Sequence, residues 1–550
     1  MPSIADTRSG TPAWLLDLDV GGRVFRFASR SVSVSAADGQ VFEYREGLAP
    51  LSLTTTDGGD SSVSVSVESS DDWAGIVASG SQVERRSAVV RRWWPSQALE
   101  QAQVYARGKT QGVEYGAPTE PLTLSIERSY AKEAFILPDP QAVIDDVTWP
   151  DDHGHTPGDG FAMATKAEGV GYPVIFGCPG HNPERGLPLA AVPVVSPSFK
   201  ETSGTTVDTS KMLIADRRIH ATNVKLWNVS ISESDTRAVQ TTTDALGRTI
   251  SYVDFQSSTL SAANETHALW IGFQDEFEGL ATVFGGGIMN DEQTAPIRGA
   301  GDVIEWVLLN LTALDVDVGR MAASKSFLNA FKVDSYINAR VNAWEWLERE
   351  VFRFLPVMVR ESSEGVYVVP MRWDASPTDV MRRLSVERGD IRRDGSVRTL
   401  SQDVVNEFTI DYRGVQGGSK WYARRVVTAQ PGRPTHTYLN TDERIYGSMR
   451  CKQSQSVFGV IPQVYQAPSV WDHPTASLIV NSLVARYTLP KQMATYVGGS
   501  ELETVEVGDV VSITDAECSI TDRLGIVIEQ TVSDSAVSIE VLLLDPTARS

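Results

Sequence analysis

One group of residues in this sequence has the types and spacing to bind a metal ion. His153 and His155 are one residue apart, and Cys178 and His181 follow with two residues between them. Imidazole nitrogen and thiolate sulfur are the ligands that Zn²⁺ prefers, and four of them close a tetrahedral site. These four residues are the candidate zinc ligands of the sequence. The alternative is that they are separate loop residues, in turns rich in glycine and proline, with no common focus.

Motifs of nucleophilic, nucleotide-binding and zinc-protease sites are absent. Gly108-Lys109-Thr110 resembles the end of a phosphate-binding loop, but Gln103 stands where that motif needs its first glycine. The sequence has no Gly-x-Ser-x-Gly, no His-Glu-x-x-His and no dinucleotide-binding Gly-x-Gly-x-x-Gly. We therefore expect no enzymatic activity, and we name no catalytic and no cofactor-binding residue.

Tryptophans supply a second hypothesis. Trp93 and Trp94 are adjacent, and Trp344 and Trp346 lie one residue apart. Exposed indole rings could stack on sugars, which would indicate a carbohydrate-binding or glycan-cleaving protein of a tail or a surface. Aromatic side chains in β-rich proteins more often anchor a core or an interface.

Composition and charge exclude several classes of protein. The chain has 550 residues, which favours three or four domains, and 41% hydrophobic with 22% charged residues is typical of folded proteins. Its net charge of −21 disfavours a nucleic-acid binder, although an acidic wall would let DNA pass without binding. Three cysteines far apart form neither a disulfide framework nor an iron–sulfur ligand set. We expect no signal peptide and no stable membrane insertion.

Strand patterns dominate both ends of the chain. Val63, Val65 and Val67 alternate with serines, which places the valines on one face of a strand. A β-rich segment also follows a loop region after residue 130, and strands around one helix at 475–489 fill the last part of the chain. Gly508-Asp509 predicts a turn or a bulge.

A different pattern occupies residues 301–373. Asp302 is placed to N-cap a short helix, and apolar residues from Ile337 to Leu355 recur at steps of three and four, which predicts a longer helix that Pro356 ends. Two β-prone runs, 357–360 and 366–369, surround a turn and predict a hairpin. The unit is thus predicted as helix, turn, helix and hairpin.

The texture of several segments resembles that of baseplate hub or tail-tip proteins of long-tailed bacteriophages, of the siphophage or gene-transfer-agent kind. The resemblance rests on FLPVMVRESSEGVYVV at 354–369, GVEYGAPTEPLTLSIERS at 112–129, VVNEFTIDY at 404–412 and VEVGDVVSIT at 505–514. It implies an α+β, mainly β chain in which two tube-like antiparallel β-barrels flank a second β domain and a helix-hairpin domain. The domains expected are 1–130, 131–295, 296–400 and 401–550.

The resemblance also implies a function. A hub is a structural virion protein at the tail tip, assembled in the host cytoplasm, whose homotrimer forms a ring between the sixfold tail tube and threefold tip components. Its partners would be the distal tail protein, the tape-measure protein and tail-tip or fibre proteins, and DNA would pass through its channel during genome ejection without specific binding. A β-rich bacterial protein related to secretion-system spikes is a further reading from the same ancestry.

Overall fold

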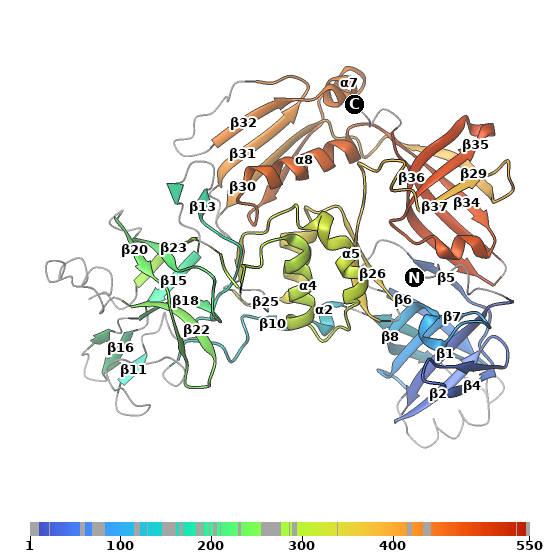
Figure 1. Ribbon diagram of the computed structural model, residues 1–550, viewed down its shortest axis with the longest axis horizontal. Helices are drawn as coiled ribbons and strands as arrows, with labels where there is room; N and C mark the ends of the chain where they lie inside the picture. Colours follow the sequence, from blue (N-terminus) through green and yellow to red (C-terminus); the bar gives the residue numbers. More distant parts are fainter. Residues whose placement is uncertain are drawn as a thin grey trace.

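The computed structural model describes residues 10–545 except 21, 56–60, 69–82, 115–120, 129, 146–160, 164–168, 183–186, 189–191, 197, 202–205, 209–210, 229–232, 255–276, 285, 289–293, 338, 363, 415–420, 433–441 and 535. The described chain is mainly β, with several separate sheets and a small group of helices (Figure 1). No described helix has the length and apolar character needed to cross a membrane.

The N-terminal sheet follows from strict alternation of apolar and polar residues. The first two strands form a hairpin, because β1 and β2 pair antiparallel with Leu16 opposite Phe27. The valines of the predicted alternating strand are buried, as Val65 and Val67 show. In order across the sheet the strands are β3 (Val32–Ser35), β4 (Val41–Glu46), β2 (Arg23–Ala28), β1 (Ala13–Val20), β7 (Ser87–Trp93), β8 (Gln103–Glu114), β9 (Leu122–Arg128) and β6 (Ser61–Val67).

The C-terminal sheet draws strands from two distant parts of the chain. One strand of the N-terminal region, β5 (Ser52–Thr55), also joins it by pairing antiparallel with β36. The other strands, in order, are β28 (Arg382–Ser385), β35 (Val510–Asp515), β36 (Ile520–Ser533), β37 (Val537–Leu543), β34 (Lys491–Gly498) and β29 (Ile391–Leu400). The predicted turn at Gly508-Asp509 is confirmed, since Asp509 N donates to Glu506 O at 3.0 Å.

The prediction of two tube-like barrels is wrong for the described strands. The two terminal sheets lie next to each other (Figure 1), and neither closes on itself. One apolar face of each sheet contributes to a single shared core, which contains Trp14 and Leu16 from one sheet and Tyr496 and Val541 from the other. Burial of one face against the other replaces the closed interior that a barrel would need.

The centre of the molecule holds the helix-hairpin unit (Figure 1). The predicted hairpin is confirmed as β26 (Val357–Glu361) and β27 (Val366–Pro370). The helices are α4 (Ala300–Leu311), α5 (Val318–Leu328), α6 (Ala343–Leu347) and a π-helical turn, Glu348–Phe352. They share one core with the four-stranded sheet beside them.

Two details of the predicted unit are wrong. The N-cap of α4 is Gly299, and Asp302 lies inside the first turn. The long helix predicted from Ile337 to Leu355 is shorter, because Ile337 pairs with Val174 in a strand and Asn342 caps α6 by accepting from Trp344 N and Glu345 N. The helix begins only after that cap, and the helical segment ends before Pro356.

A four-stranded sheet covered by α8 packs on the central unit (Figure 1). Its order is β32 (Asp442–Gly447), β31 (Trp421–Thr428), β30 (Glu407–Gly414) and β33 (Pro462–Ala467). The predicted helix is confirmed as α8 (His473–Tyr487), which Asp472 caps by accepting from Thr475 N at 2.9 Å. A second helix, α7 (Met449–Phe458), joins β32 to β33.

The middle of the chain forms another sheet, on the far side of the central unit from the terminal sheets (Figure 1). Its order is β20 (Glu233–Ala238), β19 (Asn223–Asn228), β23 (Phe277–Phe284), β15 (Val192–Ser196), β18 (Lys211–Asp216), β22 (Thr249–Asp254) and β21 (Gln240–Thr243). Smaller elements are α2 (Tyr130–Glu133), β10 (Ile136–Leu137), β11 (Phe161–Met163), β12 (Val174–Phe176), β13 (His181–Asn182), β14 (Leu187–Pro188), β16 (Ser198–Glu201), β17 (Thr206–Asp208), β24 (Ser335–Ile337), β25 (Val341–Asn342) and the 3₁₀ turns Leu99–Gln101, Ser500–Thr504 and Ala516–Cys518.

Candidate functional site

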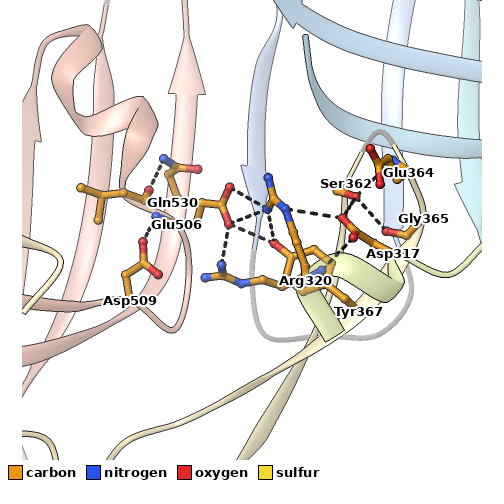
Figure 2. Close-up of polar contacts among 11 residues, drawn as sticks. Asp317, Arg320, Ser362, Glu364, Gly365, Tyr367, Glu506, Asp509 and Gln530 are labelled. Carbon is orange, nitrogen blue, oxygen red and sulfur yellow. Dashed lines mark hydrogen bonds and ion pairs between the residues drawn. The ribbon is translucent and has the colours of Figure 1, made fainter. Parts of the chain in front are cut away.

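A half-buried polar junction joins the central unit to the C-terminal sheet (Figure 2). The carboxylate of Glu506, just before β35, accepts hydrogen bonds from three side chains of the central unit. Arg320 Nη1 of α5 donates to both oxygens at 3.2 Å, Arg360 Nη1 of β26 donates at 2.7 Å, and Tyr367 OH of β27 donates at 3.0 Å. One carboxylate therefore holds a helix and both strands of the hairpin.

The donors are themselves held in place. Asp317 caps α5 by accepting from Arg320 N at 2.9 Å, and it also accepts from Ser362 Oγ at 2.6 Å. Asp317 N donates to Val366 O at 3.0 Å, which ties the start of the helix to the hairpin. The junction is thus a connected network rather than a single ion pair (Figure 2).

The electrostatics of the junction do not suit proton transfer at neutral pH. Burial opposes ionisation of Glu506, but Arg360 and Arg320 outweigh it and lower the pKa of this carboxyl. Burial, with the nearby Glu506 charge, raises the pKa of Tyr367 to about 12. A general base works best when its pKa is near the working pH, and both groups are moved away from it. The junction is built to hold parts together.

Asp509 is the exception in this network. Its carboxylate accepts from Glu506 N at 2.7 Å. Burial raises the pKa of Asp509 to about 6, Arg360 partly offsets this, and the charge of Glu506 adds to the rise. Asp509 is therefore the junction group whose charge changes nearest to neutral pH.

A second polar contact joins the two terminal sheets. Arg92 of β7 is 3% exposed, its Nη1 lies 3.2 Å from Asp534 Oδ1, and its Nε lies 3.8 Å from Glu503 Oε1. Its guanidinium also lies 4.6 Å from the centre of the Trp14 ring. Trp94 Nε1 donates to Glu503 Oε2 at 3.2 Å. Arg92 and Glu503 thus form a buried charged pair between β7 and the 3₁₀ turn Ser500–Thr504.

A third contact links the N-terminal sheet to the hairpin. Arg107 of β8 reaches Asp315 at 3.1 Å and Glu361 at 3.5 Å. The central unit therefore contacts both terminal sheets through charged side chains.

A groove of about 1380 Å³ lies where α4, the segment before β10 and the middle sheet meet. Arg217, Arg218 and Arg248 line it, and Arg217 lies 5.0 Å from the centre of the Trp306 ring. Burial raises the pKa of Asp216 to about 6, against the effect of Arg217. The lining is mixed polar and apolar.

The predicted zinc ligands are described only in part. His153 and His155 lie outside the described residues, and the side chain of His181 is not described either. Cys178 is buried, is not in a disulfide, and its N donates to Asp334 Oδ1 at 2.7 Å. In the part of the chain that the structure describes, no three His, Cys, Asp or Glu side chains gather as a metal site. The zinc site stays a prediction.

The tryptophans do not form a sugar platform. Trp93 and Trp94 are each 5% exposed, Trp344 is 2% exposed and Trp346 is 1% exposed. Trp346 packs against Phe176 with ring centres 5.3 Å apart. These rings anchor cores, as the common role of aromatic residues predicts, and the carbohydrate hypothesis loses the residues on which it depended. Gly108, Lys109 and Thr110 lie within the continuous strand β8, not in a phosphate-binding turn.

Sequence reasoning missed the junction because its members are far apart in the chain. Arg320 and Glu506 are separated by 186 residues. The one local signal is a charged residue between apolar neighbours, as Glu506 lies between Val505 and Val507. That signal identifies a buried charge but not its partner.

Comparisons with known proteins find only distant likeness. No family model matches the chain, and no curated protein matches it. Among solved structures, the 43 kDa tail protein of prophage MuSo2 from Shewanella oneidensis is 9% identical with a TM-score of 0.35, covering 97% of this chain and 99% of that chain. The tail protein from Neisseria meningitidis MC58 is 11% identical with a TM-score of 0.33, covering 97% of each chain.

A chain from the virion of a native gene transfer agent particle is 15% identical with a TM-score of 0.20, covering 50% of this chain and 91% of that chain. Scores and identities this low establish neither a family nor a function for this chain.

Proposed function

We propose that this chain is a structural protein of the virion tail of a long-tailed bacteriophage or phage-like particle, and that it acts there as the baseplate hub. Three copies would form a ring that joins the sixfold tail tube to threefold components of the tip. The observation that carries the proposal is the union of the two terminal sheets through one shared core.

The symmetry of a hub requires such a union. A trimer matches a sixfold tube only if each copy supplies two similar β units, held side by side at a fixed angle. Here strands β1–β4 and β6–β9 form one sheet, strands β28, β29 and β34–β37 form the other, and β5 crosses from the N-terminal region to the second sheet. The contacts of Arg92 and Glu506 supply the rigidity that a ring needs.

The charge of the chain suits a channel wall. With a net charge of −21, a ring of three copies would repel DNA and let it slide without binding. The proposed role is structural and requires no catalytic residue. The distal tail protein, the tape-measure protein and tail-tip or fibre proteins of the same virion are the proposed partners.

The mass of the purified protein in solution tests the proposal. Light scattering after size exclusion should give a particle near three times 60.0 kDa. A dimer or a tetramer would contradict the proposed symmetry. Binding of sugars in a glycan pulldown would instead revive the carbohydrate hypothesis.

A further inference from the structure

An exposed face of unusual composition lies on α7, the loop 459–461 and β33. Its large apolar side chains are open to solvent, with Val457 at 71%, Val460 at 60% and Val464 at 52% exposure, beside Met449 and Phe458. We call this the α7–β33 face. Exposed apolar patches of this kind mark interaction surfaces more often than accidents of sequence.

Charge is missing from the same segment. The 19 residues from Gln453 to Trp471 contain no Asp, Glu, Lys or Arg, although most of those from Ser456 to Gln466 are exposed. Between Met449 and Pro490 the one acidic residue is Asp472, which is buried as the cap of α8. Depletion of charge is the compositional sign of the centre of a protein–protein interface.

An edge strand lies in the middle of this face. β33 pairs in parallel with β30, and among the described strands it has no neighbour on its other side. Proteins protect open edges with lysine, inward-pointing charges or bulges, because an unpaired edge adds further strands. β33 reads Pro-Gln-Val-Tyr-Gln-Ala and carries no charge. Its one proline, which also protects edges, is at the first residue, so the edge from Gln463 to Ala467 is fit to receive another strand.

The face is also held rigid. Asn406 is fully buried, donates from Nδ2 to Gly459 O at 2.8 Å and accepts from Ile461 N at 2.7 Å. Gln455 Nε2 donates to Asn406 O at 2.9 Å, which fixes the end of α7 to the same residue. A preformed face loses little conformational entropy when a partner binds.

The charges at its margin point to an acidic partner. Arg450 and Lys452 lie on α7, and the exposed acidic residues that would balance them locally are absent from the segment 449–490. This chain, at −21, is itself such a partner. A strand that adds to β33 needs an edge of its own and acidic residues near it. β32, the other end strand of the same sheet, carries Asp442, which pairs with Arg444 of the same strand at 3.0 Å, and Glu443.

From these observations we infer that the α7–β33 face binds a second copy of this chain, with the β32 edge of one copy meeting the β33 edge of the next. Such a head-to-tail contact uses two different surfaces, which is what a closed ring of three copies requires. The inference rests on the homotrimer of the proposed function and identifies one of its contacts.

Two substitutions test the contact while sparing the fold. Val464→Lys places a charge on the open edge, and Val457→Lys places one on the exposed side of α7. The matched control is Val41→Lys, because Val41 is a strand residue with 54% exposure, close to the 52% of Val464. Sedimentation over a range of protein concentrations gives the midpoint of assembly, and circular dichroism checks the fold of each variant.

The two substitutions on the face should raise the assembly midpoint about tenfold or more, while the control leaves it unchanged. A trimer whose midpoint is unaffected by either substitution would overturn this inference and leave the proposed trimer standing. A wild-type chain that stays at 60.0 kDa at every concentration would overturn both.

Discussion

At the scale of single residues, the molecule is held by a few carboxylates that accept hydrogen bonds from distant elements. Glu506 is the clearest case, since its two oxygens accept from Arg320, Arg360 and Tyr367 (Figure 2). Its side chain is 29% exposed, so solvent weakens the ion pairs without removing them. The hydrogen bonds from the two arginines weaken most when Glu506 loses its negative charge.

Glu506→Gln keeps the size of the side chain and removes its charge. We expect the free energy of unfolding to fall by about 1–3 kcal/mol, because Arg360 would remain buried beside a weaker acceptor. Urea unfolding measures this. Glu501→Gln is the control, because its ion pair with Arg382 lies at the surface, and it should change stability by less than about 0.5 kcal/mol.

The raised pKa of Asp509 predicts that the stability of the folded chain depends on pH. Its pKa is about 6 in the folded chain and its ordinary value is 3.8, so the unfolded chain releases this proton first as the pH rises. The stability that protonated Asp509 contributes is full below the ordinary value and is lost as the pH rises through 6.

Asp509→Asn removes the charge and keeps an oxygen that accepts from Glu506 N. The variant should be more stable than the wild type by about 1–2 kcal/mol at pH 8 and equal to it near pH 4. Thermal unfolding at the two pH values checks this. An equal gain at both pH values would contradict the assignment.

At the scale of elements, helices α4 and α5 are joined by one shared capping residue. Asn329 ends α5, and its Oδ1 accepts from Asp302 N of α4 at 3.0 Å while its Nδ2 donates to Asp302 Oδ2 at 2.9 Å. A Cβ at Gly301 would lie 2.9 Å from that Oδ1 and 3.0 Å from Lys325 Cα. Glycine there lets the two helices approach.

Asn329→Ala removes the side chain that accepts from the first turn of α4. The free energy of unfolding should fall by about 1–2 kcal/mol, because Asp302 N loses its acceptor and the Asp302 carboxylate loses a donor. The control is Asn481→Ala on the exposed side of α8, with an expected change below about 0.5 kcal/mol. Equal effects of both substitutions in urea unfolding would contradict the capping role.

This pair of helices also shows what sequence patterns can predict. Helix α4 could be predicted because most of its sequence is apolar, and eight of its twelve residues are buried. Helix α5 buries only Met321, Ser324 and Leu328, so its sequence has no strong apolar period. The hairpin β26–β27 and helix α8 were predictable because local residues determine them. The hairpin shows two β-prone runs around a turn, and the helix shows an apolar period of three and four residues. The long helix from Ile337 was wrong because a strand pairing with Val174 competes for the same residues.

Long-range pairing sets the limit of prediction for the rest. Alternation in the terminal strands predicted sheets correctly, but the same pattern fits a closed barrel or two sheets sharing a core. The choice depends on contacts such as Gln530 with Thr55, far apart in the chain. The junction at Glu506 was not predictable for the same reason, since only the fold brings its partners together.

At the scale of the whole molecule, the shared core of the terminal sheets depends on a buried charge. Arg92 of β7 and Glu503 of the 3₁₀ turn Ser500–Thr504, which follows β34 of the C-terminal sheet, are each 3% exposed. Loss of one member of a buried pair leaves the other charge in a poorly solvated site.

Arg92→Ala should therefore lower the free energy of unfolding by about 3–5 kcal/mol. The double variant Arg92→Met with Glu503→Met should lose less, because neither charge remains buried. Arg388→Met is the control, since Arg388 is 60% exposed in its ion pair with Asp390. If Arg92→Ala lowers the free energy of unfolding by urea no more than Arg388→Met does, the Arg92–Glu503 pair does not hold the two sheets together.

Electron cryomicroscopy of the assembled particle would show whether the terminal sheets form the ring. We expect a threefold ring around an open or closed channel, with six β sheets forming its wall and both terminal sheets of each copy facing the axis. Particles without a ring, or a ring whose wall is formed by other parts of the chain, would contradict the proposal that the united terminal sheets make this protein a hub.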